Sequence, residues 1–387
     1  MQDVFTALLD KKGKKSLTLD FLKTYSFFKN SENWRLFLDQ NFSNLKVLNL
    51  PKKKINQNTQ CLDGFYHLND DFSLKAYASY VKDEQNFDFS IFQINPFIEA
   101  NIFFSEEILE INVPKNKTFL DIDISFTLSQ LATLSSPRLK LNVAENSHLV
   151  IKLTREQFKD VNAYQNSFLH CILEEGASLS LECLDSDFSY QLTESIFVEQ
   201  KKNSSFSFRS FTHGCQKCCR DIQILIHGKG CKTDIKSLAL LKNDESMFAH
   251  SHLNHFEKDA FAEQSFRSVL GEQSFCEYNG LVTIQPKAHG CDSSQSNMNL
   301  ILSDDARVYT RPQLKIDADD VSCGHGATVG QIDSEQINYL QTRGLSKAEA
   351  TLLLLKGFII DGLKGFSLLD DKSFIDHLDT MLLSYVR

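Results

Sequence analysis

The sequence predicts a mainly β protein whose central region is a β-solenoid. Between residues 96 and 332, apolar and polar residues alternate with a period of two, as in strands that bury one face. Runs such as "NSHLVI", "GASLSL", "NSSFSF" and "GCKTDI" follow a small or polar corner and recur roughly 30 residues apart, a spacing typical of solenoid repeats. In a solenoid each coil buries a face on the next. A β-sandwich, which is also built from regularly spaced short strands, is the alternative.

The region before the solenoid, residues 1–95, is expected to be mixed and partly helical. The stretches "SLTLDFLKTYSFF" and "NSENWRLFLDQNF" place apolar residues three and four apart, which is the helical pattern. Ser31 or Asn33 would cap the second helix, which contains Trp34. The polar stretch after Pro51 predicts a loop.

The region after the solenoid, residues 333–387, is expected to be helical. Asp333 begins a capping-box-like segment that ends at Gly344. Ser346 opens the apolar helix "SKAEATLLLLKGFIIDGL", and Asp371 precedes a final helix. The middle helix is apolar nearly all round, so it packs inside this region or docks against a partner.

Composition and charge limit the partners that we expect. The 387 residues are 42% hydrophobic and 24% charged, which is ordinary for a folded chain. A formal net charge of -9 argues against nucleic acid or an anionic membrane as the main partner. The chain begins without a signal-peptide pattern, and its most apolar stretch is too short to cross a bilayer. We therefore expect a cytoplasmic protein with reduced cysteines.

Enzyme motifs are missing from the sequence. There is no Walker-type phosphate loop, no G-x-G-x-x-G after a strand and no serine nucleophile elbow, so no self-sufficient active site is predicted. Asp317, Asp319 and Asp320 could supply the two facing carboxylates of a solenoid carbohydrate enzyme. Neighbouring aspartates more often solvate an outer face, which is the interpretation that we favour.

Two local clusters contain residue types that bind metals. "HGCQKCCR" holds His213, Cys215, Cys218 and Cys219, and its Cys-x-x-Cys spacing suits one ion. No second cysteine pair follows at zinc-finger distance, so buried cysteines are favoured and the role of the cluster stays open. The histidines in "HSHLNH", residues 250–255, have no Asp or Glu pattern nearby that completes a known catalytic site, and structural or interface histidines are favoured there.

A third candidate lies in "DADDVSCGHGATVG", where one glycine separates Cys323 from His325. In a strand, residues i and i+2 project from the same face, so the thiolate and the imidazole can reach toward one metal ion. Two ligands do not complete a site. The remaining ligands would come from elsewhere in this chain or from another chain.

The stretch that contains this pair strongly resembles the SufB/SufD family of iron–sulphur cluster assembly proteins. The resemblance covers "NLILSDDARVYTRPQLKIDADDVSCGHGATVGQIDSEQINYLQTRGLSKAEATLLLLKGF" and is weaker toward the N-terminus. Within the family, "CGHGATVGQ" is similar to the SufD branch. The resemblance implies a right-handed parallel β-helix between helical terminal domains.

The resemblance also implies a function as a non-catalytic scaffold subunit. A SufB-like subunit would pair with this chain edge to edge, and the pair would sit on a SufC-like ATPase that hydrolyses ATP. Cys323 and His325 match the family residues at the SufB–SufD interface, where a nascent cluster, bound transiently, would be assembled. The cysteines of "HGCQKCCR" do not match family ligands. The alternatives are a SufB-like scaffold that acts as a homodimer, and a β-helix carbohydrate-active protein.

The same resemblance points to a segment that would contact the ATPase. It lies in the motif "YLQTRGLSKAEA", at the start of the C-terminal helices. The residues implied are Arg343, Gly344, Leu345, Glu349 and Ala350.

Overall fold

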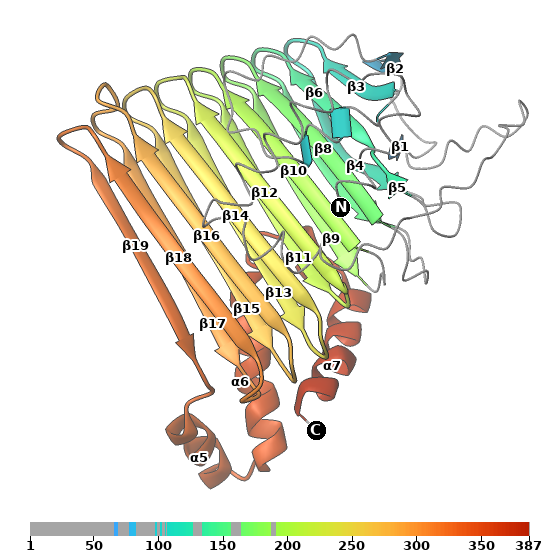
Figure 1. The fold of residues 1–387 in the computed structure, drawn as a ribbon, viewed down its shortest axis with the longest axis vertical. Helices are drawn as coiled ribbons and strands as arrows, with labels where there is room; N and C mark the ends of the chain where they lie inside the picture. The colour runs from blue at the N-terminus through green and yellow to red at the C-terminus, as the bar shows by residue number, and fades with distance from the viewer. Residues whose placement is uncertain are drawn as a thin grey trace, which may run out of the picture.

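The computed structural model confirms a parallel β-solenoid followed by helices (Figure 1). The residues it describes are 66–68, 77–82, 97–98, 101–102, 105, 107–126, 134–155, 164–186 and 191–386. The two helices expected near the N-terminus, and the loop after them, lie outside these residues.

Two sheets form the solenoid walls, and each coil contributes one strand to each sheet. The nine-stranded sheet contains β1 (Tyr66–Leu68), β4 (Thr118–Phe126), β7 (His148–Arg155), β9 (Ser178–Ser186), β11 (Ser205–His213), β13 (Lys232–Leu241), β15 (Phe261–Leu270), β17 (Asp292–Ile301) and β19 (Ser322–Gly330), in that order. The ten-stranded sheet contains β2 (Ala78–Lys82), β3 (Glu107–Val113), β6 (Arg138–Val143), β8 (Tyr164–Leu173), β10 (Gln191–Gln200), β12 (Lys217–Ile226), β14 (Ser246–His255), β16 (Phe275–Ile284) and β18 (Arg307–Ile316), and the short β5 (Leu134–Ser135) pairs with β8.

Neighbouring strands in each sheet are parallel, apart from the antiparallel pairs β1–β4 and β2–β3 among the described strands. Parallel pairing of strands one coil apart rules out the β-sandwich alternative, whose sheets are antiparallel. Because the register is constant, each inward side chain lies on the inward side chain of the previous coil. Leu181 of β9, Phe208 of β11 and Ile235 of β13 form one such column.

The corner between the two walls has a repeated backbone conformation. At this corner each coil has a residue with positive φ, and from Asn146 onward side-chain-bearing residues alternate with glycine. A Cβ atom on the glycine would overlap the Asn or Asp side chain of the preceding coil. These pairs are Asn146 with Gly176, Asn203 with Gly230, and Asp259 with Gly290.

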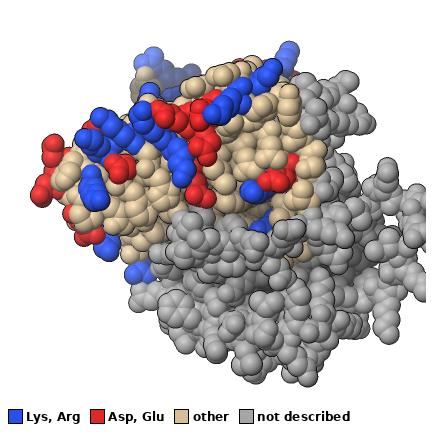
Figure 2. Space-filling view, turned by 90° about the horizontal axis from the view of Figure 1, so that it is seen from above, with Lys and Arg blue, Asp and Glu red and all other residues tan. Residues whose placement is uncertain are grey.

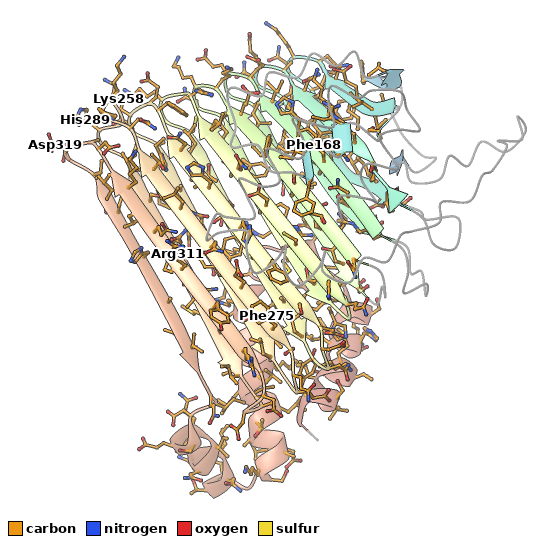
Figure 3. The ribbon with its side chains drawn as sticks, in the orientation of Figure 1. Phe168, Lys258, Phe275, His289, Arg311 and Asp319 are labelled. Carbon is orange, nitrogen blue, oxygen red and sulfur yellow. The ribbon has the colours of Figure 1, made fainter. Side chains whose placement is uncertain are left out.

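Charged side chains follow the same corner on the outside. Figure 2 shows Lys and Arg next to Asp and Glu on this face, and ion pairs join successive coils. Lys202 lies 2.6 Å from Glu175, and Lys229 lies 3.0 Å from Asp259. Farther along, Lys258, His289 and Asp319 lie along this corner (Figure 3). Such exposed pairs contribute little stability each, at most about 1 kcal/mol, so the corner depends mainly on its backbone conformation.

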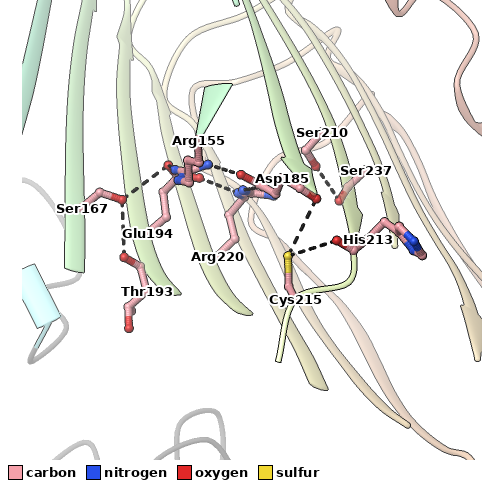
Figure 4. Close-up of polar contacts among 10 residues, drawn as sticks. All are labelled: Arg155, Ser167, Asp185, Thr193, Glu194, Ser210, His213, Cys215, Arg220 and Ser237. Atoms are coloured by element: carbon pink, nitrogen blue, oxygen red, sulfur yellow. Dashed lines mark hydrogen bonds and ion pairs between the residues drawn. The ribbon is translucent and has the colours of Figure 1, made fainter. Parts of the chain in front are cut away.

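Four charged side chains are buried inside the solenoid (Figure 4). Arg155 pairs with Asp185 and Glu194, while Arg220 contacts Asp185 at 2.5 Å and Glu194 at 2.7 Å. Burial alone would raise the pKa of Asp185, but the two guanidinium groups outweigh it and hold this pKa below its usual value. The quartet is neutral overall, which makes its burial tolerable.

Three helices follow the solenoid: α5 (Ser334–Thr342), α6 (Lys347–Gly362) and α7 (Lys372–Val386), with a 3-10 turn at Ser367–Asp370 before α7. Helices α6 and α7 pack on the outer face of the nine-stranded sheet through a second apolar cluster (Figure 1). Arg267 of β15 fastens α6, because its guanidinium contacts Asp361 at 2.5 Å and donates to the Phe358 carbonyl at 3.0 Å. No helix within the described ranges is long and apolar enough to span a membrane.

Gly230→Ala tests the corner. The substitution forces a Cβ atom into positive φ and against Asn203, so we expect the free energy of unfolding to fall by about 1–3 kcal/mol. Gly326→Ala in β19 is the matched control, because a Cβ atom there meets nothing within 4 Å. Urea unfolding of both variants measures the difference. Equal stability of the two variants would contradict the corner argument.

Arg220→Met tests the buried quartet. It leaves two carboxylates facing one arginine, and we expect a loss of about 3–5 kcal/mol in the free energy of unfolding. Because the pKa of Asp185 is lowered in the fold, its contribution is complete above the unfolded pKa and is lost as the pH falls below about 4. Urea unfolding at pH 7 and at about pH 3 measures both effects. The prediction fails if the variant is as stable as the wild type at pH 7.

Candidate functional site

The solenoid ends in two strands that are paired on one side only within the described part of the chain. β18 pairs with β16, and β19 pairs with β17 (Figure 1). No further coil of the described residues covers the interior at this end, and the inward apolar side chains are partly exposed: 41% for Ile316 and 47% for Val329. Edge strands and exposed core of this kind favour pairing with another chain.

Cys323 and His325 lie on β19 at this open end. Their register neighbours on β17 are Ser293 and Gln295, which are buried inside the solenoid. Because inward positions stack in columns, both members of the pair occupy inward positions of the last coil. Cys323 is half-buried against the core, whereas His325 is exposed. The structure therefore brings the predicted pair together at an uncovered surface.

The environment of Cys323 keeps its sulphur protonated. Desolvation raises the pKa of the Cys323 thiol, although a hydrogen bond to the backbone of Ser293 opposes this. A metal ion that binds here would therefore displace a proton.

Glycine occupies three of the outward positions of β19. Gly324, Gly326 and Gly330 alternate with the pair, and a Cβ atom on any of them meets nothing within 4 Å. These glycines are therefore not required by packing within this chain. Glycine in an edge strand is common where another backbone approaches closely.

The described residues do not complete a metal site. They contain no group of three or more His, Cys, Asp and Glu side chains with a geometry that could hold a metal ion. Cys323 and His325 are thus an incomplete ligand set in the described part of the chain.

The fold divides the "HGCQKCCR" cluster between the core, which holds Cys215 and Cys218, and the opposite side of β12. Cys218 faces the core of β12, and Cys219, the next residue, faces the opposite side of the strand. Burial raises the pKa of the Cys218 thiol to about 12 and also raises the pKa values of Cys215 and Cys219 well above the usual value. Cys215 donates to the carbonyl of His213 at 3.5 Å. Buried packing, the interpretation favoured by the sequence, fits these positions.

The histidine run is divided between two faces of β14. His250 and His252 occupy outward positions, where His250 lies 3.2 Å from Glu277 and His252 lies 3.2 Å from the Thr283 hydroxyl. His255 faces inward in a column with Ile226 and Ile284. Burial lowers the pKa of His255 to about 4, and neither ring nitrogen has a hydrogen-bond partner in the described residues.

The three aspartates after β18 belong to the solenoid corner. Asp320 has φ 55° and continues the row of positive-φ residues, while the Asp319 carbonyl contacts His289 at 2.8 Å. Asp317 lies 3.7 Å from Lys315 on the surface. These positions give the aspartates corner and surface roles, as the sequence favours over glycoside chemistry.

The segment expected to contact an ATPase has local structural roles. Arg343 ends α5 and lies over the Tyr339 ring, and Gly344 has φ +96°. Glu349 forms a capping box with Ser346, which also lowers the Glu349 pKa. Ala350 is buried, so its side chain is not available at the surface, and Leu345 is half-buried.

Sequence analysis missed the polar residues beneath His325. Gln264 and Gln295 occupy inward positions of β15 and β17, and Tyr278 faces them from β16. In the sequence they look like ordinary members of alternating strands. Only the register of the coils, which no local pattern specifies, shows that they lie under the exposed pair.

Similarity to known proteins agrees with this architecture. Residues 126–358 match the family described as SUF system FeS cluster assembly, SufBD core domain. The chain belongs to the SufBD core family and is most like its SufD members, as the sequence resemblance indicated.

Three relatives illustrate the extent of the match. The chain is 28% identical over 233 residues to the iron–sulphur cluster assembly protein SufD of Escherichia coli, covering 60% of this chain and 48% of that protein. It is 28% identical over 174 residues to a SufBD family protein of Synechocystis, covering 45% and 38%. It is 31% identical over 134 residues to SufD of Bacillus subtilis, covering 35% and 31%. The matches span about half or less of these relatives.

His255→Ile tests the buried imidazole. The unfolded histidine binds a proton below about pH 6.5 whereas the folded one does not, so His255 lowers stability as the pH falls from about 6.5 to 4. Isoleucine continues the Ile226–Ile284 column, and we expect the free energy of unfolding at pH 5 to rise by about 1–3 kcal/mol. The gain should be smaller at pH 8. Urea unfolding at pH 5 and pH 8 measures the two changes in free energy, and His377→Gln, at an exposed histidine, is the control. Equal gains at the two pH values would contradict the prediction that His255 is buried without a proton.

Proposed function

We propose that this chain is a SufD-like scaffold subunit of the SUF system and has no catalytic activity of its own. Its open solenoid end pairs with a SufB-like subunit, and a nascent iron–sulphur cluster is assembled at that seam as transient cargo. The observation that carries the proposal is the position of Cys323 and His325 on the last strand, where no further coil of the described chain covers them. Membership of the SufBD core family supports a role in the SUF system, and the open end of the solenoid supports pairing with a SufB-like subunit.

The chemistry of the pair suits this cargo. Iron–sulphur clusters take thiolate ligands, and imidazole can replace thiolate on an iron atom. The described residues offer two ligands together and no group of three, so the SufB-like subunit supplies the others. The exposed His325 meets the partner directly, while the half-buried Cys323 is shielded from solvent once the seam closes.

The C-terminal helices supply the second contact. No residue of α5 is buried, and Tyr339 of α5 and Leu353 of α6 are more than half exposed. We place the SufC-like ATPase on this surface, beside Arg343, Gly344 and Leu345. Glu349 would act through the start of α6, because its carboxylate caps that helix. ATP-driven closure of the ATPase would move α6 and α7 against the solenoid and open the seam, a rigid-body change.

Cys323→Ser and His325→Ala test the proposal in a complex co-expressed with the SufB-like and SufC-like subunits. Each variant removes one ligand from an exposed edge, so we expect the complex to assemble while iron and acid-labile sulphide bound per complex are lost. Cys291→Ala is the matched control, since Cys291 is a buried cysteine of the preceding coil that the proposal does not use.

The composition of the purified complex distinguishes the alternative. Native mass spectrometry should find one copy of this chain beside a related solenoid subunit. A cluster-bearing homodimer would favour the SufB-like alternative instead. Full cluster content in both Cys323→Ser and His325→Ala would contradict a role for Cys323 and His325 as cluster ligands.

A further inference from the structure

Two buried amides beneath His325 lack well-formed hydrogen bonds within the described residues. Gln295 is the register neighbour of His325, and Gln264 is the register neighbour of Gln295 one coil deeper. Gln295 is 2% exposed and Gln264 is 0% exposed. None of their amide oxygen and nitrogen atoms has a hydrogen-bond partner among the described residues. A buried polar group left in this way costs about 1–3 kcal/mol, so these two positions call for an explanation.

The opposite wall of the solenoid makes room for Gln295. A Cβ atom on Gly280 of β16 would overlap both the amide nitrogen of Gln295 and the hydroxyl of Tyr278. Tyr278 lies 3.3 Å from the Ser251 hydroxyl and approaches the Gln295 amide without a well-formed hydrogen bond. Gly280 therefore leaves the space that the Gln295 amide occupies, and the fold accommodates polar side chains beneath Cys323 and His325.

The last coil continues this arrangement to the surface. His325 stacks above Gln295, and Thr310 of β18 stacks above Tyr278. The Thr310 hydroxyl is also buried without a hydrogen-bond partner in the described residues. His325 therefore lies one coil above an amide whose oxygen has no hydrogen-bond partner in the described residues.

A histidine that binds a metal through one ring nitrogen normally donates its other ring N–H to a fixed acceptor, which sets the tautomer and the ring orientation. We propose that Gln295 is the positioning residue for His325. Its amide oxygen accepts the proton of the ring nitrogen that faces the interior, so the second nitrogen faces the seam with its lone pair free. This inference rests on the proposed function only in taking His325 as an iron ligand.

Gln295→Met tests the role, because methionine keeps the length of the side chain and removes both polar atoms. Gln264→Met is the matched control in the same column, because Gln264 is as buried as Gln295 and its amide atoms have no hydrogen-bond partner in the described residues. Neither variant should lower the melting temperature, since each removes unpaired buried polar atoms. Gln295→Glu retains an acceptor oxygen and serves as the rescue.

The probe is Co²⁺ added without oxygen to the full-length chain and followed by thiolate-to-cobalt absorption. The signal is assigned to the pair by its loss in Cys323→Ser and His325→Ala. We expect Gln295→Met to weaken Co²⁺ binding about 10- to 100-fold, Gln264→Met to bind as the wild type does, and Gln295→Glu to recover most of the affinity. A second sample is loaded with Zn²⁺ instead of Co²⁺ and studied by long-range ¹H–¹⁵N spectra. The wild type should show one ring tautomer of His325, and Gln295→Met should show a mixture of the two.

Wild-type affinity and tautomer in Gln295→Met would overturn the inference, as would equal losses in Gln295→Met and Gln264→Met. A wild-type chain that binds no Co²⁺ through His325 would overturn it as well. Failure of the proposed function is recognised separately. In that case the Co²⁺ and tautomer differences persist, while His325→Ala leaves cluster content in the complex unchanged.

Discussion

The stacking of each coil on the coil before it is the constraint on which the whole molecule depends. Parallel strands in constant register bring inward side chains of successive coils within contact distance, about 4.8 Å apart along the axis. Each core residue is therefore matched to a neighbour roughly one repeat away in sequence. Such a core has no natural end. The last coil leaves its inward residues uncovered, and Cys323 and His325 are among them.

The character of the interior changes along the axis. The early coils are filled by aliphatic side chains such as Leu141, Ile151 and Leu153. Beyond the buried quartet, hydroxyl and amide groups enter the core, and some pair across coils, as Ser268 does with Asn299 at 2.6 Å. The coil beneath the exposed end therefore presents polar inward side chains, which can hydrogen-bond to an imidazole as hydrocarbon side chains could not.

Much of the fold could be predicted from the sequence, because period-two alternation and polar corners are local signals. The same holds for the capping box that begins α6 and for the glycine that ends α5. The Cys323–His325 pair was also local, two residues apart on one strand. The register was not predictable, since repeats of unequal length leave no fixed offset between coils. Gln295, Gly280 and the quartet around Arg220 depend on register alone, so no sequence pattern identified them.

The alternation at the corner has a consequence for how such a solenoid can change its length. From Asn146 onward, a residue with a side chain lies over a glycine, so the smallest repeating unit of the corner is two coils. Deleting or duplicating a single coil would place two side-chain-bearing corner residues, or two glycines, in consecutive coils. Removing or adding two adjacent coils preserves the alternation of side-chain-bearing residues and glycines. A designer who extends this part of the solenoid should therefore copy coils in twos, so that each side chain still lies over a glycine.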